Sequence, residues 1–189
     1  MSLSLNIIKG DLIVNSNVKE VFQFLESNDV QSLQKSLTSN PSLANAENEQ
    51  GLTPLGFAAH LGNKDSVKTL LDFHADINAV SHSKVEYIPS NTALHAAIAG
   101  SGNMEVIELL LKNEAKTNIF DSNGHTALHT AAFHDDNTQL INLLIKHGAS
   151  VEDKIDGGKT AMELAIEQGN NRVAEQLKQF VNPAKDNVK

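Results

Sequence analysis

The chain has 189 residues, of which 40% are hydrophobic, enough for a continuous core. Aromatic residues make up only 4%, so small and aliphatic side chains must build that core, which suits closely packed helices better than a sheet sandwich. With 23 acidic and 15 basic residues the net charge is −8, which argues against nucleic acid as a partner. The absence of cysteine excludes disulfides and thiol chemistry.

Residues 1–17 form a segment in which short apolar clusters flank Lys9-Gly10-Asp11, a sequence compatible with a hairpin turn. The segment lacks the positive start and continuous apolar run of a signal peptide. Met1-Ser2-Leu3 is compatible with a cloning remnant. We favour an arm packed on the helices that follow, and a linker from a lost leader is the alternative. A cytoplasmic location is favoured accordingly, and export with the leader removed stays open.

Two apolar-periodic stretches follow within residues 18–47, and their spacing predicts two amphipathic helices. The first contains Val18, Val21 and Leu25, and the second contains Leu33 and Leu37. We interpret this region as a degenerate repeat that covers the N-terminal end of the core.

A threonine-centred segment then occurs four times, with the threonines at positions 53, 92, 126 and 160 and spacings of 39, 34 and 34 residues. A threonine hydroxyl can cap a helix by accepting an orphan backbone N–H. Pro54 suits the first helical position, where its missing N–H costs nothing. Each threonine is therefore predicted to begin a short helix. The four segments read Gly51-Leu52-Thr53-Pro54-Leu55-Gly56-Phe57-Ala58-Ala59, Asn91-Thr92-Ala93-Leu94-His95-Ala96-Ala97, Gly124-His125-Thr126-Ala127-Leu128-His129-Thr130-Ala131-Ala132 and Gly158-Lys159-Thr160-Ala161-Met162-Glu163-Leu164-Ala165.

Two further patterns complete each unit. Gly62, Gly102 and Gly169 stand where a left-handed glycine can end the first helix, and each is followed by Asn and a leucine-rich helical stretch. Segments such as Ala75-Asp76-Ile77-Asn78 then close the unit. Each unit is thus predicted to consist of a helix, a turn, a second helix and an extended loop.

These motifs resemble the ankyrin repeat, with its period of ~33 residues and its Thr-Pro-Leu-His-x-Ala signature. The resemblance covers roughly residues 48–180 and implies an all-α solenoid of stacked helix-turn-helix units with projecting β-turn fingers, about five repeats in all. The predicted boundaries are an N-terminal arm (1–17), a degenerate N-terminal capping repeat (18–47), repeat one (48–80), repeat two with an enlarged finger (81–120), repeat three (121–154), a C-terminal capping repeat (155–182) and a tail (183–189).

The chain has eight histidines, which raises the question of a metal site. His95 and His129 lie in the repeat signature, and the resemblance implies a structural role for both. Most of the others lack the spacing and cysteine support expected of zinc ligands, so we expect surface histidines, no metal and no cofactor. The alternative is a metal-dependent or acid–base hydrolase that uses His125, His134 and nearby carboxylates.

The resemblance implies that the fingers and the first helices line a concave groove, and that the chain is a non-catalytic module binding a protein partner. We expect a monomer, no nucleic acid and, since no run of about 18 apolar residues occurs, no membrane insertion. Leu52, Leu61, Tyr87 and Phe133 are expected at exposed positions, and exposed apolar and aromatic side chains are typical of binding sites. Leu61 and Phe133 can instead pack between repeats. The candidate binding residues are Leu52, His60, Leu61, Tyr87, Asn91, Asn123, His125, Phe133, His134 and Gln168.

Overall fold

In the computed structural model of the chain, residues 17–155 and 157–181 are described, and they form five consecutive helix pairs. The arm interpretation of residues 1–16, including Met1-Ser2-Leu3 and Lys9-Gly10-Asp11, and the tail prediction lie outside this range. The helices are residues 17–27 with α2 (Val30–Ser39), α3 (Pro54–Leu61) with α4 (Lys64–Asp72), α5 (Ala93–Ala99) with α6 (Met104–Lys112), α7 (Ala127–His134) with α8 (Thr138–Lys146), and α9 (Ala161–Gln168) with α10 (Asn171–Val181).

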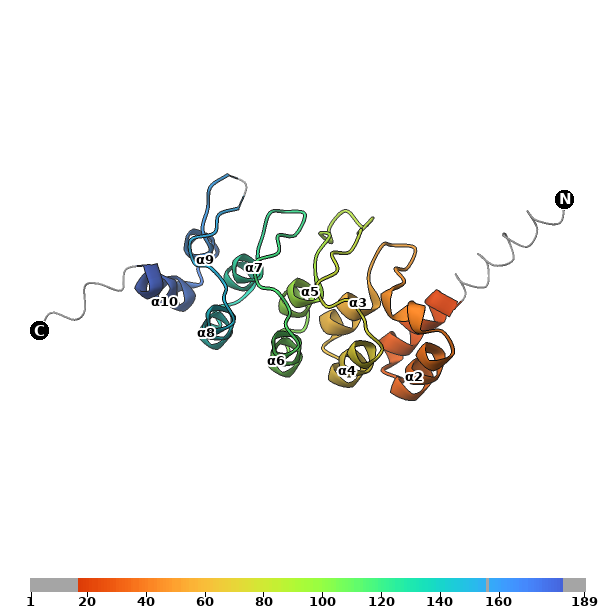
Figure 1. Cartoon of the computed structure of the whole chain (residues 1–189). Coiled ribbons are helices and arrows are strands. Elements are labelled where there is room, and N and C mark those ends of the chain that lie inside the picture. The colour runs from red at the N-terminus through yellow and green to blue at the C-terminus, as the bar shows by residue number, and fades with distance from the viewer. Residues whose placement is uncertain (1–16, 156, 182–189) are drawn as a thin grey trace, which may run out of the picture.

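The helices lie in two rows, with loops that project along one side of the array (Figure 1). The inner row, next to these loops, consists of α3, α5, α7 and α9, and each of its helices contacts the next. The outer row consists of α4, α6, α8 and α10. We call the projecting loops finger one (46–53), finger two (79–92), finger three (119–126) and finger four (151–160). The isolated β-bridge Lys154–Thr160 in finger four is the one β-type pairing within the described residues, so the all-α prediction is confirmed.

The inner helices begin at the repeated threonines, as predicted. The Thr53 hydroxyl accepts a hydrogen bond from the Gly56 N–H at 3.1 Å, with Pro54 at the first helical position. Thr160 and Glu163 form a reciprocal capping box at the start of α9. These contacts satisfy backbone N–H groups that have no partner within the first turn.

Glycines end two of the inner helices in the left-handed conformation. Gly62 and Gly169 cap α3 and α9 with φ angles of 75° and 77°. The corresponding prediction for Gly102 is wrong, because α5 ends at Ala99 and Gly100 is its C-cap. Gly100 lies so close to the preceding repeat that a Cβ there would be 2.4 Å from the His60 carbonyl oxygen. Gly102 does have a positive φ of 62°, but in the turn that follows.

Asparagines of the Gly-Asn pairs link successive repeats. The side-chain amides of Asn63, Asn103 and Asn170 donate to the carbonyl oxygens of Leu25, Gly62 and Ala132 at 2.9, 3.0 and 2.9 Å. Each of these acceptors lies at or near the end of the first helix of the preceding pair. The asparagines therefore fix the spacing of the stack, and the hydrophobic effect of the buried core stabilises it.

The core runs without interruption along the whole array. Both rows contribute fully buried aliphatic side chains, and paired alanines allow the inner helices to approach one another closely. Phe22 and Phe57, with ring centroids 5.2 Å apart, join the N-terminal pair to the next one. The largest fully buried side chains include Leu33, Leu70, Leu94, Leu110, Leu128, Ile141 and Leu177.

In the described part of the chain, no helix has the length and apolarity needed to cross a membrane.

Candidate functional site

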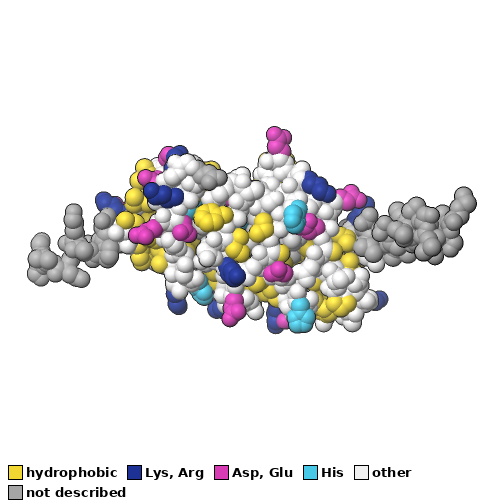
Figure 2. Space-filling model, turned by 45° about the horizontal axis from the view of Figure 1, so that its top comes forward, with side chains coloured by type: hydrophobic (Ala, Val, Ile, Leu, Met, Phe, Trp, Pro, Cys, Tyr) yellow, Lys and Arg dark blue, Asp and Glu magenta, His cyan; other side chains and the backbone are white. Residues whose placement is uncertain are grey.

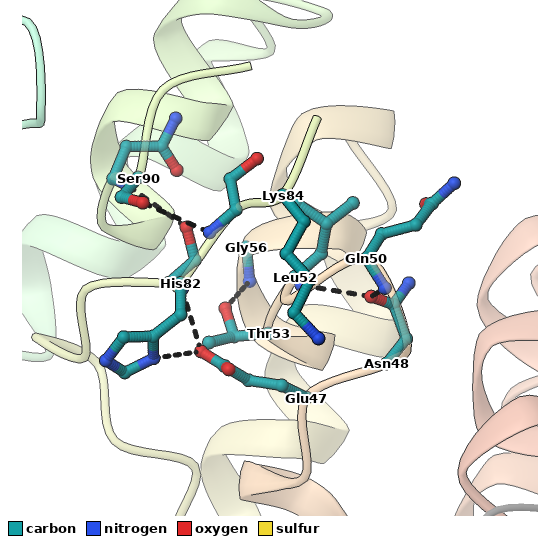
Figure 3. Close-up of polar contacts among 12 residues, drawn as sticks. Glu47, Asn48, Gln50, Leu52, Thr53, Gly56, His82, Lys84 and Ser90 are labelled. Carbon is teal, nitrogen blue, oxygen red and sulfur yellow. Dashed lines mark hydrogen bonds and ion pairs between the residues drawn. The ribbon is translucent and has the colours of Figure 1, made fainter. Parts of the chain in front are cut away.

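Finger one is closed by an asparagine. The Asn48 side-chain oxygen accepts hydrogen bonds from the N–H groups of Gln50 and Leu52, both at 3.0 Å (Figure 3). Gly51 takes a φ of 74°, which a residue with a Cβ adopts only with strain. The fingertip is therefore a tight turn with a defined backbone.

Finger two pairs with the tip of finger one through backbone hydrogen bonds. The N–H groups of His82 and Lys84 donate to the carbonyl oxygens of Gly51 and Gln50, each at 2.9 Å. The Glu47 carboxylate accepts from the His82 N–H at 3.0 Å and lies 2.9 Å from the His82 ring nitrogen Nδ1 (Figure 3). A Cβ at Gly51 would lie 1.9 Å from the His82 carbonyl oxygen, so only glycine permits this approach.

The other limb of finger two pairs with finger three. The Ser90 N–H donates to the Ser122 hydroxyl at 3.0 Å, and the Ser122 N–H donates to the Ser90 carbonyl oxygen at 2.9 Å. A hollow of about 410 Å³ is lined by residues 83–90 of finger two and by Ser122 and Asn123 of finger three. The enlarged finger is thus held by both neighbours, while Tyr87 projects from it with 86% of its surface exposed.

Finger three repeats the turn of finger one with an aspartate. The Asp121 carboxylate accepts from the N–H groups of Asn123 and His125 at 2.9 and 2.8 Å. Its backbone N–H also donates to the His125 carbonyl oxygen at 2.8 Å. Since Asn48 and Asp121 each stand five residues before a helix-capping threonine, their shared role can be read from the sequence.

Three histidines and a phenylalanine form an aromatic cluster on the third repeat. The ring centroid of His125 lies 6.2 Å from that of His129 and 6.1 Å from that of Phe133, and Phe133 lies 5.2 Å from His134 in an edge-on arrangement. His129 is buried, whereas Phe133 is 38% exposed and His134 is also exposed. The cluster therefore presents an apolar and aromatic surface at the end of α7.

The surroundings lower the pKa of several histidines. Burial lowers the pKa of His129 and of His134, and the neighbouring His125 lowers both further by charge repulsion. Burial also lowers the pKa of His95, against the opposing attraction of Asp121. Hydrogen bonds from the Thr160 backbone and hydroxyl lower the pKa of the Glu163 carboxyl.

Signature histidines hold the fingers to the inner helices, as the resemblance implied. His95 Nδ1 lies 2.8 Å from the Thr92 hydroxyl, and Nε2 lies 3.0 Å from the His125 carbonyl oxygen. His129 Nδ1 likewise lies 2.8 Å from the Thr126 hydroxyl. These contacts orient the first turn of each helix against the finger beside it.

The candidate binding residues divide by exposure. Leu61 is 38% exposed, and Tyr87, Phe133, His134, Asn123 and Gln168 are also exposed, whereas His125 is half-buried. The interpretation of Leu52 as an exposed residue is wrong, because this side chain is half-buried and packs against the core.

Two other candidates make contacts within the fold. The Asn91 carbonyl oxygen accepts from the Ser81 N–H at 2.9 Å, and the Asn91 N–H donates to the Ser81 hydroxyl at 3.0 Å. His60 is exposed, yet its ring nitrogen Nδ1 would lie 2.5 Å from a Cβ at Gly100, so the ring lies against the next repeat. His60 therefore lies at the junction between neighbouring repeats, whereas the contacts of Asn91 join the two ends of finger two.

Sequence reasoning missed several exposed apolar side chains. Val80 and Phe120 are 37% and 47% exposed and occupy equivalent places, two residues after Asn78 and Asn118. This shared offset from an asparagine could have identified both positions from the sequence. Ile166 on α9 is 58% exposed and was not among the candidates either.

The hydrolase alternative requires a convergent set of ligands or catalytic groups. His125 and His134 both contact the Phe133 ring. Among the described residues, no group of three or more histidine, aspartate or glutamate side chains is arranged to hold a metal ion. Figure 2 shows hydrophobic patches lying between separate acidic and histidine side chains on the face it presents.

Comparison with known proteins agrees with this architecture. A family model described as ankyrin repeats (3 copies) matches residues 18–121 and 94–187. The chain is also similar to the rat (Rattus norvegicus) ankyrin repeat and SAM domain-containing protein 6, with 31% identity over 106 residues. That alignment covers 56% of this chain and 11% of the rat protein, so the chain spans a small part of that relative's length. The family match extends over most of the chain, including the N-terminal helix pair, and the chain belongs to the ankyrin repeat family.

Proposed function

We propose that this chain is a non-catalytic module that binds a protein partner through a concave face formed by the fingers and the inner row. Ankyrin repeats are protein-interaction modules, and the partner and the binding face are our inference. The distribution of exposed large hydrophobic side chains is the observation that supports this face. Among the described residues, Leu61, Val80, Tyr87, Phe120, Phe133 and Ile166 lie on fingers or inner helices, while the other two, Phe180 and Val181, end α10.

The outer helices offer a different surface. Val67, Leu110 and Leu144, one on each of α4, α6 and α8, are fully buried in the core. No large hydrophobic side chain in α4, α6 or α8 is among the exposed ones. Because binding hot spots combine aromatic side chains with a surrounding polar rim, the finger side suits a protein partner better than the outer row does.

Preorganisation favours the same face. Fingers one, two and three are joined by hydrogen bonds between Gly51 and His82, Gln50 and Lys84, and Ser90 and Ser122. A surface already ordered before binding loses less conformational entropy when a partner arrives. Tyr87 and the aromatic cluster are thus presented on a fixed frame.

The test measures capture of a partner by single variants. Tyr87→Ala and Phe133→Ala remove exposed aromatic side chains, and Asp72→Ala is a matched control on the outer row. Proteins retained from native lysate by the wild-type chain are identified, and their affinities for purified variants are measured. We expect the aromatic variants to weaken binding by about 1–2 kcal/mol or more, with unchanged circular dichroism, and Asp72→Ala to bind normally.

Equal affinity of all variants for every retained protein would refute the assignment of this face. The ankyrin repeat family is generally a non-catalytic scaffold, and no specific observation favours the hydrolase alternative. We therefore assign no catalytic residue.

A further inference from the structure

The two sides of the array differ in charge. The finger side comprises residues 46–61, 79–99, 119–134, 151–155 and 157–168. It carries eight carboxylates and three lysines, a formal charge of −5, whereas the outer row carries six cations and five carboxylates, a charge of +1. The finger-side charges are Glu47, Glu49, Glu86, Asp121, Glu152, Asp153, Glu163 and Glu167 against Lys84, Lys154 and Lys159.

Some of these carboxylates are already used within the fold. Glu47 contacts His82, Glu167 pairs with Lys159 at 2.8 Å, and Asp121 closes finger three. Within the described part of the chain, no hydrogen bond or ion pair involves the side chains of Glu86 and Glu152, which are both exposed. Finger two and finger four therefore each present an uncommitted negative charge to the surroundings.

Aromatic rings lie between these charges along the array. Tyr87 directly follows Glu86 in finger two, and Glu152 lies in finger four. Phe133 lies on α7, between finger three and finger four in the chain. The face of an aromatic ring attracts cations, and this attraction is stronger where water is displaced. Partial desolvation and the neighbouring His125 lower the pKa of His134, which reduces the positive charge that this ring carries against the carboxylates.

We propose that the partner segment received by the finger side is rich in lysine and arginine. This inference rests on the proposed function and adds the chemistry of the partner. The negative potential of the finger side attracts such a segment before contact, and the aromatic rings then contact its cations and their aliphatic stems. The outer row, with its slight positive charge, offers no such complementarity.

The test selects peptides from a random display library on the immobilised full chain. We expect enrichment of lysine and arginine and depletion of aspartate and glutamate in the selected peptides. An enriched peptide is then synthesised, and its affinity is measured for two double variants that each change the net charge by +4. These are Glu86→Lys with Glu152→Lys on the finger side, and Asp72→Lys with Glu175→Lys on the outer row.

The finger-side variant should weaken binding about tenfold or more at low salt, because two attractive charges become repulsive. The outer-row variant should stay within about twofold, since its charges lie on the opposite row. Equal weakening by both variants would overturn the inference, because only net charge would then matter. Circular dichroism and thermal unfolding confirm that both variants are folded.

Two other results separate this inference from the proposed function. Enrichment of neutral apolar peptides whose binding is lost in Phe133→Ala or Tyr87→Ala would overturn the basic partner and leave the finger side as the binding face. A failure to enrich any peptide that depends on the finger side would overturn both.

Discussion

His95 and His129 occupy the same position in successive repeats but differ at Nε2. In His95 this nitrogen lies 3.0 Å from the His125 carbonyl oxygen. In His129 the Nδ1 atom accepts from the Thr126 N–H at 3.3 Å, which places the proton of the neutral ring on Nε2. That Nε2 is buried, and although the backbones of Lys159 and Asp153 lie near it, no acceptor among the described residues meets hydrogen-bond geometry.

We therefore expect His95→Ala to cost more stability than His129→Ala, by about 1 kcal/mol, the usual net contribution of an intramolecular hydrogen bond. Both variants lose similar packing, since both rings are buried. Urea unfolding followed by circular dichroism measures the difference. A larger loss for His129→Ala would contradict this account of the two junctions.

The lowered pKa values of His95 and His129 also predict how stability depends on pH. In the unfolded chain a histidine has a pKa near 6.5. Because both pKa values are lower in the folded protein, the unfolded state binds more protons between the two values. The free energy of unfolding is therefore unaffected by these histidines above about pH 6.5, where both rings are neutral in both states. It decreases as pH falls from there to the folded-state pKa, by about 1.4 kcal/mol for each unit by which the pKa is lowered.

Urea midpoints measured between pH 7.5 and pH 5 test this expectation. The double variant His95→Asn with His129→Asn should show a clearly shallower decline than the wild type over this range. Glu163 and Asp29 have lowered carboxyl pKa values, so their contribution is lost only at more acidic pH. An identical slope in the double variant would contradict the role of these histidines.

At the scale of the element, the fingers depend on contacts between repeats. Gly51 and Gly148 both have positive φ angles, 74° and 89°. A Cβ at Gly51 would collide with the His82 carbonyl group, whereas a Cβ at Gly148 meets nothing within 4 Å. Alanine at Gly148 therefore introduces backbone strain alone, whereas alanine at Gly51 introduces backbone strain and also disturbs the pairing of fingers one and two.

We expect Gly148→Ala to destabilise the chain by about 1 kcal/mol from backbone strain alone. Gly51→Ala should cost a further 1–3 kcal/mol or so, because finger two must move away. Urea unfolding gives both values, and amide exchange at His82 and Lys84 reports the loss of pairing. Equal costs, with those amides still protected, would show that the fingers are not coupled in this way.

The sequence allowed the helix starts to be predicted but not the pairing of the fingers. Thr53 caps its own helix, and such a local contact follows from neighbouring residue types. The bond between His82 and Gly51 joins residues 31 positions apart, so it depends on how two repeats are aligned. The same holds for Gly100, the C-cap of α5, whose close approach to His60 of the preceding repeat leaves no room for a Cβ.

The candidate site was predictable to a similar degree. The exposed positions of Tyr87 and Phe133 follow from their place in the repeat. Leu52 and His125 have equivalent places in the repeat, and both side chains are half-buried. Periodicity therefore indicates which face a residue occupies, while the extent of its burial depends on the contacts it makes there.

In the whole molecule, the outer row and the finger side differ in the kinds of side chain that they expose. Helices α4, α6 and α8 of the outer row expose no large hydrophobic side chain, whereas the finger side carries exposed aromatic rings and most of the excess negative charge. Since repeats of this kind contact mainly their neighbours, the surface can vary from finger to finger without loss of the stack.

Hydrogen–deuterium exchange of the chain, free and bound to its captured partner, tests whether the finger side is the binding face. We expect slower exchange on binding in residues 84–90 of finger two and in finger three, with α6 and α8 unchanged. Slower exchange confined to the outer row would contradict the assignment of the finger side as the binding face.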